Sequence, residues 1–131
     1  MLMAKVFISF LFLTNVLNFE VAQTAKEKEV GMMYRKTWGK IDGMLFINDS
    51  PVRVCYWMKN TYLPMTMWFM DNDLGLLESY TPAPLSTALV TSSNTNVRFV
   101  LEIKPELTNT VIKNYALFRK RMQEQLAGVL Q

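Results

Sequence analysis

The feature that most constrains the fold is the segment Trp57-Met58-Lys59-Asn60-Thr61-Tyr62-Leu63-Pro64. Strongly apolar stretches lie on both sides of it, and short apolar stretches of this kind are typical of buried strands. Three polar residues followed by a proline do not fit the middle of a buried strand, because proline lacks the N–H that the ladder needs. We therefore expect two core strands joined by a polar corner over residues 57–61.

Composition bounds the chemistry available to the chain. The 131 residues fit one domain, and half of them are hydrophobic, which is enough for a core. There is no histidine, which excludes Ser-His-Asp and Cys-His nucleophiles and the commonest metal ligand. The single cysteine, Cys55, excludes an intrachain disulfide and a thiolate zinc site. The glycines form no phosphate-binding loop, and we expect no cofactor.

The net charge of +3 comes from the C-terminal part of the chain, residues 96–131, where the basic run Arg119-Lys120-Arg121 lies. So few basic residues do not make a nucleic-acid footprint, and we expect no nucleic-acid partner.

The apolar patterns predict an α+β fold with a mostly antiparallel or mixed sheet that curls toward a barrel. Thr24 and Glu27 have the spacing of a capping box, which predicts a helix over residues 25–36. Gly31 inside that helix indicates close packing on the sheet. Strands are expected over five segments: residues 44–47, 52–58, 65–70, 74–78 and 96–103.

A long C-terminal helix is expected to begin at Pro105 and to end near Gly128. Its apolar stripe has helical spacing and consists of Leu107, Val111, Tyr115, Phe118, Met122 and Leu126. This stripe predicts packing on the sheet of the same domain. A membrane-surface or partner role for the helix, with its basic outer side, is the alternative.

The N-terminal segment permits two interpretations. One lysine, Lys5, precedes an apolar run over residues 6–13, as at the start of a signal peptide, although no good cleavage site follows. Alternatively, residues 10–21 contribute two strands that turn at Thr14-Asn15 and belong to the fold. We favour export or membrane association, and both interpretations stay open. The expected organisation is a hydrophobic segment over 1–18, a β-rich domain over 19–104 and the helix over 105–131.

Several motifs together resemble a known family, the domain-of-unknown-function family 192, over about residues 19–104. The resemblance rests on Thr24-x-x-Glu27, Gly31-Met32-Met33-Tyr34-Arg35, Asp42-Gly43-Met44-Leu45-Phe46, Trp57-Met58-Lys59-Asn60-Thr61 with Pro64, Asp71 with Gly75, and Phe99-Val100-Leu101-Glu102. It implies a compact β-rich barrel with flanking helices, and an N-terminal export signal in many members. It implies no particular reaction, since none is established for the family as a whole.

The chain departs from the family pattern at two places. Thr66 stands where family members usually carry an acidic residue, two positions after the proline. If that carboxylate serves a site, the site is weakened in this chain. Beyond Glu102, the expected turn and final strand are replaced by the segment that begins at Lys104-Pro105-Glu106, so the barrel is expected to close differently.

The polar corner supplies the candidate ligand-binding residues. They are Trp57, Lys59, Asn60 and Thr61, together with Arg35 and Glu102, which the fold can bring to the corner. Lys59 can bind an anion or act as a base, Asn60 can orient a carbonyl or phosphate, and Trp57 can stack on a ring. The structural alternative is that Asn60 and Thr61 satisfy backbone groups at a tight turn.

Three functions are consistent with these residues. The favoured one is a non-enzymatic, exported or membrane-proximal module that binds an unknown small ligand or an envelope protein at the corner. The second is a histidine-independent hydrolase or transferase that uses Lys59 with Glu102 or Asp71. The third is an interaction protein that acts through its C-terminal helix. Copper ligation by the methionines Met32, Met33, Met58, Met65, Met67 and Met70 is a weaker alternative to core packing, and no metal site is expected.

Overall fold

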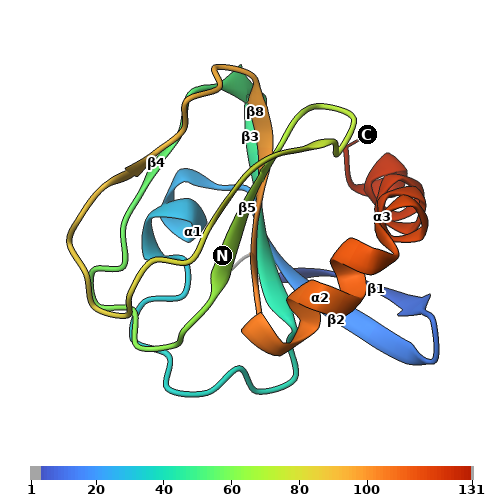
Figure 1. Cartoon of the computed structure of the whole chain (residues 1–131), viewed down its shortest axis with the longest axis horizontal. Coiled ribbons are helices and arrows are strands. Elements are labelled where there is room, and N and C mark those ends of the chain that lie inside the picture. The colour runs from blue at the N-terminus through green and yellow to red at the C-terminus, as the bar shows by residue number, and fades with distance from the viewer. Residues whose placement is uncertain (1–3, 131) are drawn as a thin grey trace.

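A six-stranded sheet divides the molecule into two sides in the computed structural model, which describes residues 4–130. Its strand order is β1-β2-β3-β8-β5-β6. Figure 1 shows the sheet nearly edge-on, with α1 on one side and α2 and α3 on the other. The strands are β1 (Val6–Phe12), β2 (Asn15–Ala22), β3 (Gly43–Val52), β8 (Val97–Ile103), β5 (Thr66–Met70) and β6 (Leu76–Tyr80).

The predicted α+β class with a mixed sheet is confirmed, because β2 and β3 pair in parallel and the other neighbours are antiparallel. The barrel implied by the family resemblance is wrong: in the described chain β1 and β6 are edge strands and the sheet is not closed. The strand expected over 52–58 is reduced to β4 (Cys55–Tyr56), which pairs only with β7 (Val90–Thr91). Residues 48–51, which lie between two of the expected strands, continue β3 through a register shift between Ile47 and Val52.

The first two strands form a hairpin, as the second interpretation of the N-terminal segment predicted. Every residue of β1 pairs with β2, from Val6 opposite Val21 to Phe12 opposite Asn15. Alternate residues of β1, Ile8, Phe10 and Phe12, are buried in the core. Residues 6–22 therefore contribute directly to the sheet, and export stays a prediction from the sequence.

The parallel pairing of β2 and β3 explains the position of α1 (Ala25–Val30). Parallel neighbours cannot be joined by a tight turn, so residues 23–42 cross one face of the sheet and α1 lies there. The predicted capping box is present: Thr24 Oγ1 accepts from the Glu27 N–H at 3.1 Å, and Glu27 Oε1 accepts from the Thr24 N–H at 2.9 Å.

α1 ends at Val30 and not at residue 36, because Gly31 leaves the helical conformation with φ of +49°. A Cβ at Gly31 would lie 3.3 Å from the Phe46 ring, so the predicted close approach to the sheet is confirmed.

The C-terminal segment covers the opposite face. It consists of a 3₁₀ turn η1 (Pro105–Leu107), α2 (Thr108–Lys113) and α3 (Tyr115–Val129). The expected single helix is thus interrupted at Asn114, whose φ of −122° is not helical. Val111, Phe118, Met122 and Leu126 from the predicted stripe are buried against the sheet. The stripe therefore packs on the sheet of its own chain.

Each face of the sheet has its own core. The methionines are divided between them: Met70 belongs to the core beneath α3, and Met32, Met58, Met65 and Met67 belong to the core on the α1 side. This distribution is that of packing side chains, because Met fills irregular gaps in cores.

Candidate functional site

A cleft of about 490 Å³ opens on the α1 side of the sheet. One wall is α1 with the turn that follows it, the floor includes Phe46 of β3 and Glu102 of β8, and the other wall runs from Val52 to Trp57. Binding clefts for small molecules are typically of this size and combine apolar walls with a few polar groups. Among the predicted site residues, Trp57, Thr61 and Glu102 line this cleft.

Glu102 is the most unusual group in the cleft. Its cross-strand neighbours are Met44 on β3 and Met67 on β5, neither of which offers a proton to a carboxylate. The residue is only 5% exposed, and burial raises the pKa of its carboxyl group to about 8. Among residues 4–130, no hydrogen-bond donor or basic partner offsets this burial, and the carboxyl reaches the cleft.

Two aromatic residues line the cleft together with Glu102. Tyr56 packs edge-on against Phe46, with ring centroids 5.4 Å apart. Burial raises the pKa of the Tyr56 hydroxyl, and the charge of nearby Glu102 adds to the rise. Trp57 is 45% exposed at the mouth of the cleft. The cleft thus brings together an exposed indole, a half-buried phenol and a buried carboxyl group.

The other charged lining residues are Lys28 and Glu29 on α1 and Arg53 on the opposite wall. Lys28 Nζ donates to the Ile47 carbonyl at 3.1 Å, which holds its ammonium group at the sheet. Glu29 and Arg53 are exposed. Neither of the two cations forms an ion pair with Glu102 in the described chain.

The corner residues Lys59 and Asn60 are not among the residues that line the cleft. The Lys59 ammonium lies 5.1 Å from the centre of the Trp57 ring. Asn60 has a left-handed φ of 56°, and its side-chain amide donates to the Tyr34 hydroxyl at 3.0 Å. Thr61 Oγ1 donates to the Lys59 carbonyl at 3.1 Å. Thr61 thus satisfies a backbone group, as the structural alternative predicted, whereas the Asn60 side chain bonds a tyrosine hydroxyl.

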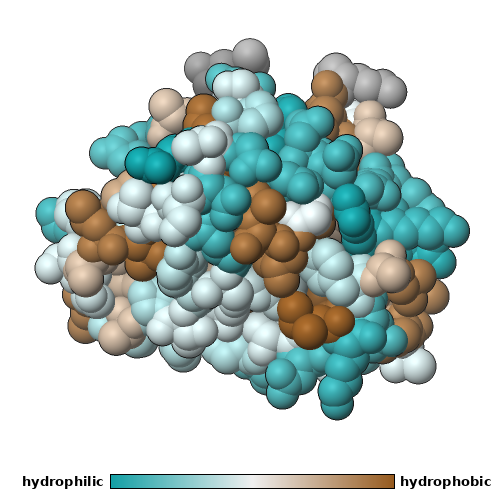
Figure 2. Space-filling model, turned by 45° about the horizontal axis from the view of Figure 1, so that its top comes forward, coloured by the Kyte–Doolittle hydropathy of each residue, from teal (hydrophilic) through white to brown (hydrophobic). Residues whose placement is uncertain are grey.

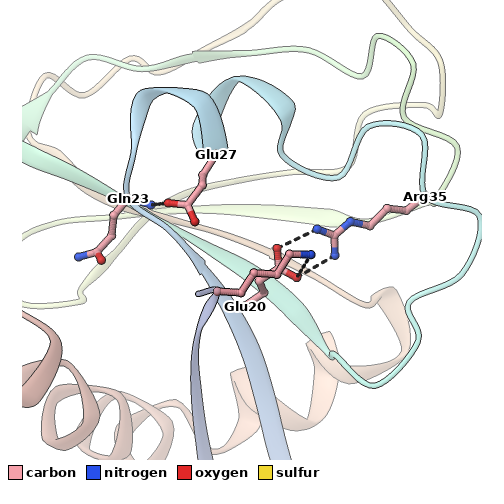
Figure 3. A network of polar contacts seen from close by, with 5 residues as sticks. Glu20, Gln23, Glu27 and Arg35 are labelled. Carbon is pink, nitrogen blue, oxygen red and sulfur yellow. Dashed lines mark hydrogen bonds and ion pairs between the residues drawn. The ribbon is translucent and has the colours of Figure 1, made fainter. Parts of the chain in front are cut away.

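Arg35 lies at a second, smaller cleft of about 210 Å³. Its guanidinium donates two hydrogen bonds, of 2.9 and 2.8 Å, to the two carboxylate oxygens of buried Glu20. Figure 3 shows the two side chains pointing toward each other beside the first turn of α1. Arg35 is therefore engaged in an ion pair and does not join the corner residues.

The residues expected for a histidine-independent enzyme do not converge. Asp71 lies four residues beyond Met67, the β5 partner of Glu102, which is about 13 Å along the strand. Its carboxylate accepts from the N–H groups of Asp73 and Gly75 at the β5–β6 turn. Neither Asp71 nor Lys59 lines the cleft with Glu102.

Thr66, the departure from the family pattern, lies on the other face of the sheet. It pairs with Ile103, which is adjacent to Glu102 and so points to the α3 side. The identity of residue 66 therefore does not change the floor of the cleft.

Sequence reasoning missed Tyr56 and Arg53 as cleft residues, because neither belongs to the polar corner. A signal was present for Glu102 itself: it is the only acidic residue in a strand, residues 97–103, whose two faces are both buried.

Within residues 4–130, no group of three or more acidic or cysteine side chains could hold a metal ion. No helix in that range is both long and apolar enough to cross a bilayer.

An open mixed sheet with a carboxyl-floored cleft on one face and two helices on the other defines a small α+β domain. The chain belongs to the domain-of-unknown-function family 192, described as "Uncharacterized ACR", whose family model matches residues 12–114. The match extends beyond the expected 19–104 and takes in the end of β1 and all of α2. The resemblance predicted from the motifs is therefore confirmed.

Two solved structures share this fold. A protein of unknown function from Novosphingobium aromaticivorans DSM 12444 has a TM-score of 0.64 at 23% identity, over 80% of this chain and 77% of that one. A protein from Sinorhizobium meliloti 1021, described as a candidate transcription regulator, has a TM-score of 0.65 at 32% identity, over 77% of this chain and 81% of that one. No curated protein matches this chain.

Proposed function

We propose that the protein is a ligand-binding module whose site is the cleft between α1 and β4. The observation that carries this proposal is the carboxyl group of Glu102, buried at the floor of the cleft without a partner in the described chain. No fully buried side-chain oxygen among the described residues lacks a partner, so the Glu102 carboxyl group is open to the cleft. A poorly solvated acid that faces a cleft is a typical feature of a functional site.

Trp57, which is exposed, and Thr61, which is buried, complete the lining of the proposed site. Trp57 offers a large exposed ring, a feature enriched at binding surfaces. Lys59 supports the site indirectly by lying over this ring. The proposal thus keeps Trp57, Thr61 and Glu102 from the predicted corner site as ligand contacts.

The description of the Sinorhizobium protein as a regulator finds little support in this chain. Two members of the basic run 119–121 are engaged: Arg119 Nε donates to the Asp73 carbonyl at 2.7 Å, and Arg121 pairs with Glu124 at 3.3 Å. A transcription regulator binds DNA, and contacts with the DNA phosphates need basic groups that are not engaged elsewhere.

A fragment-binding experiment tests the cleft. The ¹⁵N-labelled full chain is titrated with a library of small aromatic fragments, and shifted amide signals are mapped. We expect shifts to cluster on residues 28–32, 53–57 and 102, and Trp57→Ala to weaken binding at least fivefold. Tyr62→Ala is the matched control, because Tyr62 is 44% exposed, like Trp57, but does not line the cleft. Shifts that cluster elsewhere, or equal effects of the two variants, would refute the proposal.

Export to the cell envelope is a separate proposal, supported by the apolar N-terminal run and its preceding lysine. Since residues 6–22 form two strands of the sheet, an exported form with this fold keeps them. We expect the protein in an extracytoplasmic fraction of its native host with residues 6–22 retained, as measured by intact mass. An intact chain confined to the cytosol would exclude export.

A further inference from the structure

We propose that the cleft binds an organic cation, such as an amine or a quaternary ammonium compound, with Glu102 as its counter-charge. This inference rests on the proposed function and specifies the ligand class for the same site. It follows from three features: the unpaired acid at the floor, the aromatic residues that line the cleft with it, and the hydrogen bond that holds Lys28, one of the two basic lining residues, at the Ile47 carbonyl.

The floor of the cleft offers a cation a carboxylate that no basic residue within 4–130 pairs with. Glu20, the other buried acid on this side of the sheet, shows the contrast, because Arg35 binds both of its oxygens. Lys28, the basic residue that α1 contributes to the lining, donates a hydrogen bond to the Ile47 carbonyl. An external cation therefore supplies the charge that the protein supplies at Glu20 but not at Glu102.

The walls of the cleft suit the rest of such a ligand. Trp57 and Tyr56 contribute aromatic rings, and a ring face attracts a cation electrostatically. The mouth already accommodates a cation in this way, since the Lys59 ammonium lies over the Trp57 ring. Met32, Phe46 and Val54 line the interior with apolar surface for the hydrocarbon part of the ligand. An anionic ligand would instead be repelled by Glu102 whenever that carboxyl group is ionised.

Protonation of Glu102 makes the inference sharply testable. With its pKa raised by burial to about 8, Glu102 is mainly protonated at pH 6, and a bound cation must displace that proton. Affinity for a permanent cation is therefore expected to fall about tenfold for each pH unit below 8 and to level off above it. The other ionisable groups facing the cleft are Lys28 and Glu29 from α1, Arg53 from the opposite wall, and Cys55 and Tyr56 from β4.

The experiment measures the affinities of three probes, each with one phenyl ring, for the full chain: benzyltrimethylammonium, benzyl alcohol and benzoate. Calorimetry or NMR titration is carried out from pH 6 to pH 9. We expect benzyltrimethylammonium to bind at least tenfold more tightly than the other two at pH 9, and to bind about 100-fold more weakly at pH 6. Benzyl alcohol, which carries no charge, should show little dependence on pH.

Glu102→Gln and Asp49→Asn distinguish the effect of the acid in the cleft from the effect of the net charge of the protein. The first variant keeps the shape of the protonated acid, and we expect it to abolish both the preference for the cation and its pH dependence. Asp49 is exposed and outside the cleft, so Asp49→Asn, which removes the same charge, should change the affinity less than twofold. Equal or tighter binding of benzyl alcohol or benzoate within the cleft would overturn this inference alone. Failure of all three probes to bind in the cleft would overturn the inference together with the proposed function.

Discussion

The two faces of the sheet differ in the side chains that they bury. On the α3 face, Phe118 contacts five other aromatic rings, those of Phe10, Phe12, Phe19, Trp68 and Tyr115, with centroids 5.8 to 6.3 Å apart. On the α1 face, the apolar core shares the sheet surface with two buried carboxyl groups, Glu20 and Glu102. Figure 1 places these environments on opposite sides of one layer of strands.

The difference shows how a small domain can keep a destabilising group. Tightly packed aromatic and aliphatic side chains beneath α3 supply hydrophobic stabilisation, which is roughly proportional to the apolar area buried. The α1 face then accommodates a cleft and an unpaired acid at some cost in stability. The surface shown in Figure 2 has only small apolar patches among polar residues, so this view shows no broad apolar face.

Phe118→Ala is the most severe test of the α3 face. Phe118 is 1% exposed, and removing its ring leaves a cavity among the aromatic residues around it. We expect a loss of about 3–5 kcal/mol in the free energy of unfolding, measured by urea denaturation. Phe118→Leu should lose much less, and equal losses for the two variants would contradict the packing argument.

Arg35→Ala tests the paired acid on the α1 face. It leaves Glu20 buried, with only Lys5 nearby at 3.9 Å. Since Arg35 is partly exposed, we expect a loss of about 2–3 kcal/mol in the free energy of unfolding, at the low end for a broken buried pair. The double variant Glu20→Gln, Arg35→Ala should recover part of this loss, and a double variant less stable than Arg35→Ala would refute the explanation.

Glu102→Gln tests the unpaired acid through the pH dependence of stability. The folded-state pKa, about 8, lies above the ordinary value of 4.5, so the folded protein retains a proton that the unfolded chain releases. The contribution of Glu102 is therefore fully present below pH 4.5 and is lost as the pH rises toward 8. Between pH 6 and 7, the wild type should lose about 1 kcal/mol relative to Glu102→Gln, as measured by urea denaturation at each pH. Parallel pH profiles for the two proteins would show that Glu102 titrates normally.

Lys59→Ala is expected to have the smallest effect. Its ammonium stacks on an exposed ring, and such contacts contribute about 0.5–1 kcal/mol. Thermal unfolding should therefore show a small decrease in stability. A larger loss than for Arg35→Ala would mean that the corner, and not the Glu20 pair, secures this side of the sheet.

Much of the fold was predictable because local patterns determine it. The apolar residues of 97–103, the capping box at Thr24 and the stripe of the C-terminal helix each specify an element, and the stripe also specifies its buried side. The open sheet was not predictable, because closure depends on how β1 and β6 lie in space and not on any local pattern. The interruption at Asn114 has no signal in the apolar stripe, which runs through it.

The candidate site was predictable only in part, for a similar reason. The corner was found from its polarity, but polarity does not show which side chains turn toward a cleft. Lys59 contacts Trp57 and Asn60 contacts Tyr34. Glu102 lies 41 positions beyond Thr61, the last residue of the corner, and strand pairing brings it to the same region. Such long-range proximity depends on topology and is not written in the spacing of residues.

The parallel pairing of β2 and β3 has an evolutionary consequence. Because the chain between them must cross the sheet, one wall of the cleft is the connection itself, and the floor belongs to strands that the connection does not alter. Lengthening or shortening residues 31–42 would reshape the cleft while leaving the strand register in place. Relatives with the same strand order could in this way diversify the molecules they accept without inventing a new fold.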